Sequence, residues 1–186
     1  MLVLSMDPGT SNFAASVLRT DLDEDIKVRV EGTKLVKNTI TNVQKSCEQI
    51  AKFRKELRAI EKDVGKFDLV VAERFQSRGH GGTTIESINM MLGAIALTYP
   101  MTEFYTASVW KNAFNKYHDL KGFYEDHKSM VASTPKKDRR TVHELDSSLM
   151  GIYHSAKFFG TEPFSNLGSE RKLQKFLKHW NASKEL

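Results

Sequence analysis

The sequence has only one cysteine, Cys47, and no apolar run that approaches the roughly 18 residues of a membrane-spanning helix. A single cysteine excludes an intramolecular disulfide and a zinc site built from several cysteines. The first residues also lack the basic and then apolar layout of a signal peptide, because Asp7 interrupts the first apolar stretch. We therefore expect a protein of the reducing cytoplasm with no membrane partner.

The composition is that of an ordinary globular protein whose positive charge is concentrated in its second half. Hydrophobic residues make up 40% of the 186 residues and charged residues 27%, which suits one domain. The formal net charge is +5, and residues 111–140 carry eight basic against four acidic side chains. A phosphate backbone would be attracted to this half. We find no repeat or linker, so we expect one domain over residues 1–186, with 161–186 as a basic C-terminal extension.

The spacing of apolar residues predicts a mixed α/β domain. Short apolar or alternating runs predict five strands, over residues 2–7, 13–18, 26–37, 67–73 and 101–106. Helical spacing predicts helices over residues 41–64, 83–98, from 141 onward and 170–180, with a partly helical stretch over 109–134. This order favours a mixed five-stranded sheet flanked by helices.

Three acidic residues lie where ligands of a divalent metal ion would be expected. Asp7 directly follows the first apolar strand and Glu73 the fourth, while Asp146 lies on the last long predicted helix. If the two strands pair, both strand-end carboxylates lie at one edge of the sheet. Carboxylate oxygens suit Mg²⁺, and two ions about 3.5–4 Å apart can drive phosphodiester cleavage. Asp before Pro-Gly is also common in turns, and a strand-end Glu is often only solvated.

Two polar residues beside Asp146 have alternative interpretations. Thr141 and Glu144 fit a capping box, which gives Glu144 a structural role and makes Asp146 the better candidate acid. His143 lies three residues before Asp146 on the same helix face, so it could be a metal ligand or a general base. A solvated histidine at a helix start would have the same spacing. A histidine ligand would allow Mn²⁺ as well as Mg²⁺.

Basic and aromatic residues supply candidate DNA contacts. The glycine-rich loop after Glu73 could contact phosphates, and its Phe75 could insert between unstacked bases or instead pack in the core. A second group interleaves aromatic and basic side chains, a pattern that suits distorted DNA but is more often ordinary packing. That group comprises Phe114, Tyr117, Phe123 and Tyr124 with Lys111, Lys116 and Lys121. The complete set of predicted DNA-binding residues is Arg74, Phe75, Arg78, His80, Lys111, Lys121, Lys136, Lys137, Arg139 and Arg140.

Three segments resemble, in the same order, the signature segments of the RuvC-like Holliday junction resolvases. They are Ser5 to Thr10, Val70 to Glu73, and His143 to Leu149. The resemblance covers roughly residues 1–160 and implies the RNase H-like fold. It also implies a homodimer that makes paired nicks across a four-way DNA junction with Mg²⁺ or Mn²⁺. From the two-ion chemistry of phosphodiester cleavage we expect two ions per site. The metal-binding and catalytic residues that it implies are Asp7, Glu73, His143 and Asp146.

The sequence departs from the family pattern in its DNA-contacting segments. The family has a junction-wedging aromatic just after the strand-end Glu, whereas Phe75 is offset, and its glycine- and lysine-bearing segment is not recognisable in 107–122. The insertion around 115–140 and the basic tail suggest a divergent, phage-type member, which would act in the host cytoplasm. Two other functions stay open. One is an RNase H-like nuclease for RNA, RNA–DNA hybrids or other branched DNA, and the other is a non-catalytic basic DNA-binding module.

The helix predicted over residues 83–98 has more apolar positions than one buried face needs. Met90 and Met91 lie beside its core stripe, and Gly93 allows a close approach. Such a helix could form a two-fold dimer face. A helix that is wholly internal to one chain would show the same pattern.

Overall fold

The computed structural model describes residues 1–21, 27–37, 42–75, 82–116, 119–136, 139–160, 176, 180 and 183–186. One sheet forms its centre, in the strand order β5-β4-β1-β2-β3-β6. The strands are β1 (Leu2–Pro8), β2 (Asn12–Asp21), β3 (Lys27–Lys37), β4 (Leu69–Glu73), β5 (Glu103–Tyr105) and β6 (Lys184–Glu185). The five predicted strands are thus confirmed, and the two-residue β6 extends the sheet beside β3.

The sheet is mixed because its two halves are connected differently. β1, β2 and β3 follow one another as antiparallel neighbours, which tight connections allow. β4 and β5 add to the other side of β1 as parallel strands, after crossovers through helices. β1 and the middle of β4 are buried on both faces, which explains their continuous apolar sequences.

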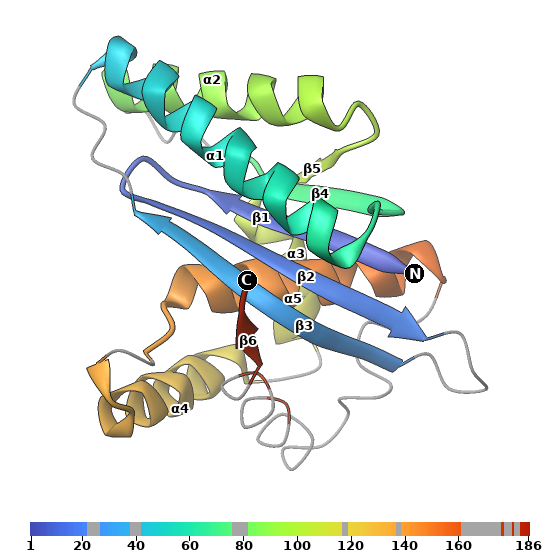
Figure 1. Cartoon of the computed structure of the whole chain (residues 1–186). Coiled ribbons are helices and arrows are strands. Elements are labelled where there is room, and N and C mark those ends of the chain that lie inside the picture. Colours follow the sequence, from blue (N-terminus) through green and yellow to red (C-terminus); the bar gives the residue numbers. More distant parts are fainter. Residues whose placement is uncertain are drawn as a thin grey trace.

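In the described part of the chain, five helices cover the two faces of the sheet: α1 (Val43–Val64), α2 (Thr83–Thr98), α3 (Ala107–Asn115), α4 (Leu120–Ser133) and α5 (Val142–Phe158). Figure 1 shows α1 and α2 on one face and α5, with α3 and α4, on the other. Side chains of β1 point alternately to the two faces of the sheet. Leu2, Leu4 and Met6 join the core under α1 and α2, while Val3 joins the core under α5. None of the described helices is both long and apolar enough to span a membrane.

Helix α5 packs unusually close to the sheet. A Cβ at Gly151 would lie 2.4 Å from Leu18 Cδ1 and 3.0 Å from Ser5 Cβ, so only glycine fits this contact. About one turn before Gly151, Ser16 Oγ on β2 lies 2.5 Å from Ser147 Oγ and 2.9 Å from Ser148 Oγ. These contacts fix both the depth and the rotation of α5 over β1 and β2.

Some local predictions need correction. Asn42 caps α1, its Oδ1 accepting a hydrogen bond from Lys45 N at 2.9 Å, whereas the proposed cap Thr41 lies outside the described residues. The strand predicted over 101–106 is shorter, and the stretch predicted over 109–134 consists of α3 and α4. Most of the helix predicted over 170–180 lies outside the described residues. Trp180 in that region is buried, with its Nε1 donating to Ser148 Oγ at 2.9 Å.

Candidate active site

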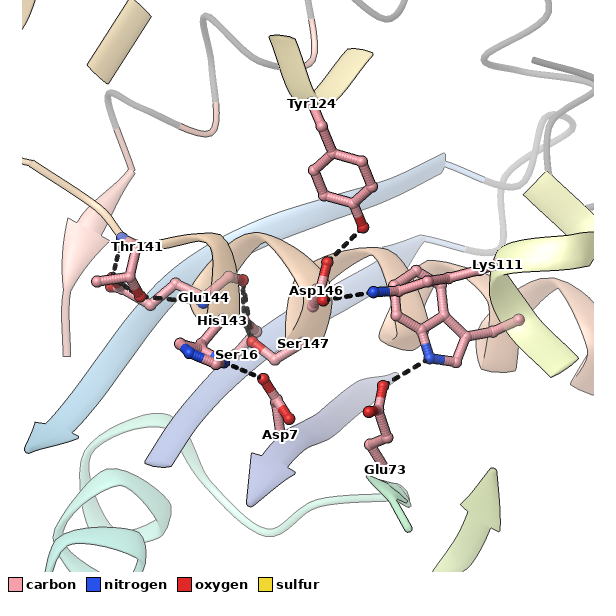
Figure 2. Close-up of polar contacts among 11 residues, drawn as sticks. Asp7, Ser16, Glu73, Lys111, Tyr124, Thr141, His143, Glu144, Asp146 and Ser147 are labelled. Carbon is pink, nitrogen blue, oxygen red and sulfur yellow. Dashed lines mark hydrogen bonds and ion pairs between the residues drawn. The ribbon is translucent and has the colours of Figure 1, made fainter. Parts of the chain in front are cut away.

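Asp7 and Glu73 are neighbours on the face of the sheet that α5 covers. The parallel register of β1 and β4 pairs Val3 with Leu69 and Met6 with Ala72, so the next residue on each strand is an acid. Because side chains alternate along a strand, Asp7 lies on the same face as Val3, and Glu73 on the same face as Leu69 and Val71. Figure 2 shows both carboxylates at the strand ends, directed toward α5.

His143 contacts Asp7 directly. Its Nδ1 lies 2.7 Å from Asp7 Oδ2, and the Asp7 side chain is only 13% exposed. This hydrogen bond, together with the negative charges of Asp7, Asp146 and Glu73, raises the pKa of His143. The contact joins the first turn of α5 to the end of β1.

Asp146 lies one turn further along α5 and is held by two donors. Lys111 Nζ on α3 donates to Asp146 Oδ2 at 2.8 Å, and the Tyr124 hydroxyl on α4 donates to Oδ1. Burial raises the pKa of Asp146 despite the Lys111 ammonium, and burial beside Asp146 raises the pKa of Tyr124. Helices α3 and α4 therefore fix the orientation of this carboxylate.

Glu73 accepts a hydrogen bond from the indole of Trp110. The Trp110 Nε1 lies 3.0 Å from Glu73 Oε2, and Lys111 Nζ lies 4.8 Å from the centre of the Trp110 ring. Burial and the negative charge of Asp7 raise the pKa of Glu73 to about 7, although the contacts with Trp110 and Lys111 lower it. Without a cation other than Lys111 nearby, the Glu73 carboxyl therefore keeps its proton up to about neutral pH.

The predicted metal-binding residues come together as a cluster but not as a finished metal site. Within the parts of the chain that the structure describes, no three His, Cys, Asp and Glu side chains are placed to hold a metal ion. Each acid instead contacts a protein donor: Asp7 contacts His143, Glu73 contacts Trp110, and Asp146 contacts Lys111 and Tyr124.

The chemistry of the cluster nevertheless fits a divalent cation. Asp7 and Asp146 both raise the pKa of Glu73, and all three acids raise the pKa of His143. Raised pKa values mean that the folded chain keeps protons which a cation among the acids would displace. The donor set, carboxylates with one imidazole, suits Mg²⁺ or Mn²⁺.

Glu144 does not belong to the cluster, and the predicted capping box is confirmed. Its Oε2 accepts from Thr141 N at 2.7 Å, while its own N–H donates to Thr141 Oγ1. The other oxygen, Oε1, accepts from Thr33 Oγ1 on β3 at 2.8 Å. Both carboxylate oxygens are therefore engaged in holding the start of α5.

The predicted DNA-binding residues have different positions. Phe75 is 47% exposed, so it is not part of the core, and Arg74, Lys121 and Lys136 are exposed as well. Lys111 is half-buried and pairs with Asp146, and its contact with DNA stays a prediction. Three further predicted DNA-binding residues lie outside the described residues: Arg78 and His80 of the glycine-rich loop, and Lys137.

Some residues predicted to face DNA have other roles in the structure. Arg140 is buried, stacks on Trp180 with 5.4 Å to the ring centre and donates to Ser183, so it is not a solvated residue, and its contact with DNA stays a prediction. Arg139 donates to the carbonyls of Thr134 and Ala132 and so closes the end of α4. Phe114 and Phe123 are core residues, as their simpler interpretation predicted.

Comparison with known proteins gives a match at the level of structure only. No protein-family model matches the sequence, and no curated protein matches it either. The solved structure of Thermus thermophilus RuvC superposes with a TM-score of 0.63 at 16% identity, covering 87% of this chain and 98% of that one. The chain has the RuvC fold. T. thermophilus RuvC in complex with a Holliday junction substrate gives a TM-score of 0.61 at 19% identity with the same coverage.

The RuvC fold confirms the predicted RNase H-like fold class, and identities this low show the fold alone.

In this chain, two residues around the cluster were not predicted as part of it: Trp110 beside Glu73 and Tyr124 beside Asp146. The sequence signal for both was weak, because an indole or a phenol in an amphipathic helix is usually a core residue. Their roles depend on how α3 and α4 fold back over β4 and α5.

Proposed function

We propose that this protein is a metal-dependent endodeoxyribonuclease that resolves four-way DNA junctions by paired, symmetric nicks. The observation that most supports this function is the cluster itself, in which Asp7, Glu73, His143 and Asp146 come from two strand ends and one helix. The pKa values of Glu73, His143 and Asp146 are all raised, which favours a cation at this position. Similarity of fold to RuvC in complex with a Holliday junction substrate supports the choice of DNA.

Asp7, Glu73 and Asp146 would hold the metal ions, Mg²⁺ or Mn²⁺ and two per site, with His143 as a further ligand or a general base. Bound there, such ions supply Lewis-acid activation of the scissile phosphate and of the attacking water. The roles of the protein groups follow from their contacts. Trp110 orients Glu73, and Lys111 with Tyr124 orients Asp146. His143 has one ring nitrogen on Asp7, which leaves Nε2 to accept or donate a proton.

DNA would approach along the exposed residues beside the cluster. Arg74 and the exposed Phe75 directly follow Glu73 at the end of β4. An aromatic ring at this position can separate bases at a branch point, and an adjacent guanidinium can bind a phosphate. Lys121 and Lys136 would add contacts to the backbone, so that DNA affinity falls steeply with salt.

We also infer that two copies act together, since two scissile strands in a two-fold junction need two sites. The outer side of α2 supports this inference, because Leu97 is 85% exposed and Met101 in the following turn 89% exposed. Gly93 on the same helix is exposed, and a Cβ added there would meet no heavy atom within 4 Å. Met91, by contrast, is a core residue, and so this methionine is not available to a partner.

A cleavage assay on a synthetic four-way junction with mapped nick positions tests the proposal. Wild-type protein with Mg²⁺ or Mn²⁺ is expected to nick two opposite strands at symmetric positions. Asp7→Asn is expected to bind the junction and not to cut it. An RNA–DNA hybrid and a flap, tested in parallel, separate junction resolution from other nuclease activities. Salt-sensitive binding without any nicking would instead indicate a non-catalytic DNA-binding protein.

A further inference from the structure

A cavity of about 640 Å³ lies between α4 and the start of α5, beside the acidic cluster. This volume is within the range of roughly 300–1,000 Å³ that is typical of small-ligand sites. Its walls combine apolar surface from Val131 and Val142 with the ring of Tyr124. The cavity therefore has room and surface for a planar, partly apolar group.

Positive charge surrounds the cavity. Among the described residues, four basic side chains line it, against a single acid, Glu125. Lys128 is 80% exposed at its rim, and Arg139 is fixed there by its hydrogen bonds to the carbonyls of Thr134 and Ala132. A ligand with both an aromatic ring and a phosphate would match this combination of apolar walls and cationic rim.

His127 contributes to the cavity wall and carries an unsatisfied polar atom, Nε2, that is itself buried. The residue is only 5% exposed, and its Nε2 has no hydrogen-bond partner among the described residues. Burial lowers the pKa of His127, so the ring is neutral at physiological pH and can donate or accept one hydrogen bond. Buried polar atoms without a partner are rare, and a ligand atom is one explanation for such a group.

The cavity is continuous with the acidic cluster through two shared side chains. Lys111 and Tyr124 both line the cavity, and both donate hydrogen bonds to Asp146. A group seated against Tyr124 is thus one side chain away from a predicted metal ligand. A nucleotide adjacent to the scissile phosphate is the part of a DNA substrate that would be at this distance.

We propose that this cavity holds one unstacked nucleotide of the strand that the enzyme cuts. Its base lies against Tyr124 between Val131 and Val142, its edge bonds to His127 Nε2 after a rotation of that buried ring, and its phosphate lies at Lys128 and Arg139. The proposal rests on the proposed function in that the ligand is part of the DNA substrate. It assigns to α4 a role in selecting the nick position, since only a strand that can release a base fits.

The test uses the full chain and a four-way junction with the fluorescent base 2-aminopurine at successive positions around the crossover. Ca²⁺ replaces Mg²⁺, so the readout needs DNA binding and not cleavage. Wild-type protein is expected to raise the fluorescence at one position, which reports unstacking. Val131→Trp fills the cavity and should abolish this rise and weaken binding by roughly 5- to 150-fold, the effect of losing one base stack. Ser129→Trp, on the same helix, exposed and outside the cavity lining, should behave as wild type.

His127→Phe keeps the ring and removes the unpaired nitrogen. We expect this variant to melt at the same temperature as wild type or higher, and yet to reduce the fluorescence change. No position-specific rise with wild type, or equal behaviour of the two tryptophan variants, would overturn the nucleotide site. A junction that is cut normally while the fluorescence stays flat would reject this proposal alone. A positive fluorescence signal without cleavage under Mg²⁺ would reject the nuclease function and keep a site for one unstacked nucleotide of the bound junction, without a cut strand.

Discussion

At the scale of single residues, the candidate site is a group of acids whose negative charges repel one another. Glu73 illustrates the consequence, since burial and Asp7 raise its pKa from an ordinary value of 4.5 to about 7. Between these two values the folded chain holds a proton that the unfolded chain has lost. The free energy of unfolding therefore falls as the pH rises through this range. The raised pKa of His143 acts in the same direction, because its stabilising contribution is lost as the pH passes its folded pKa.

Glu73→Gln should separate stability from function. At pH 8 without metal, the amide removes a charge that the fold disfavours and still accepts the hydrogen bond from Trp110. We expect the free energy of unfolding to rise by about 1–3 kcal/mol and junction cleavage to be lost. Thermal melts at pH 5 and pH 8 would measure the first effect, and the gain should shrink at pH 5. A variant that is less stable at pH 8 would contradict this explanation of the raised pKa.

Replacing the carboxylate by an amide should have opposite effects at Glu144 and Asp146: a loss of stability at the first and a loss of cleavage at the second. Glu144→Gln weakens the capping box and the bond to Thr33, so we expect a loss of about 1–2 kcal/mol with cleavage retained. Asp146→Asn leaves the cap intact and removes a predicted metal ligand, so we expect cleavage to be lost without a comparable loss of stability. Denaturant unfolding and the junction assay on both variants measure these effects. Loss of cleavage in a stable Glu144→Gln protein would contradict the assignment.

At the scale of elements, the position of α5 over the sheet determines whether the site can assemble. His143 and Asp146 reach the strand-end acids only because Gly151 allows α5 to lie against Leu18 and Ser5. The sequence predicted α5, its capping box and both acid-bearing strands, because these depend on local spacing and on buried apolar runs. It did not predict the contacts of Trp110 and Tyr124, since these depend on where α3 and α4 pack.

Gly151→Ala should move α5. The added methyl would lie 2.4 Å from Leu18 Cδ1, so the helix or the sheet must shift. We expect a loss of about 1–3 kcal/mol from overpacking, together with reduced cleavage. Gly93→Ala in α2 is the matched control, because its Cβ meets no heavy atom within 4 Å. Higher helix propensity should stabilise that variant by up to about 1 kcal/mol. Equal stability of the two variants in urea unfolding would show that α5 has more room than the structure gives it.

At the scale of the whole molecule, the chain has its acidic cluster at the ends of β1 and β4 under α5, and an exposed apolar surface, Leu97 and Met101, at the end of α2. Figure 1 shows that α2 lies on the opposite face of the sheet from α5, so a partner on α2 would leave the acidic cluster uncovered. The class of fold and most of its elements could be predicted from the sequence. The buried position of Trp180 could not, because a tryptophan in a basic tail has no periodic pattern to mark it as core.

The dimer is open to a direct test by sedimentation. Leu97→Glu combined with Met101→Glu places two charges on the exposed apolar surface next to α2. We expect wild type to sediment as a dimer and the double variant as a monomer with an unchanged melting temperature. The monomer should nick junctions singly rather than in pairs, because the two sites are no longer held together. A double variant that remains dimeric would place the interface elsewhere.

The most direct measurement of the central claim is calorimetric titration of the protein with Mg²⁺ at pH 8 and pH 6. If the three acids share a metal site, wild type binds Mg²⁺ more tightly at pH 8, because Glu73 must lose its proton. Asp7→Asn, Glu73→Gln and Asp146→Asn should each weaken binding by about tenfold or more, while Glu144→Gln should bind as wild type does. Mg²⁺ binding that is indifferent to all three acids, or that depends on Glu144 instead, would contradict the site.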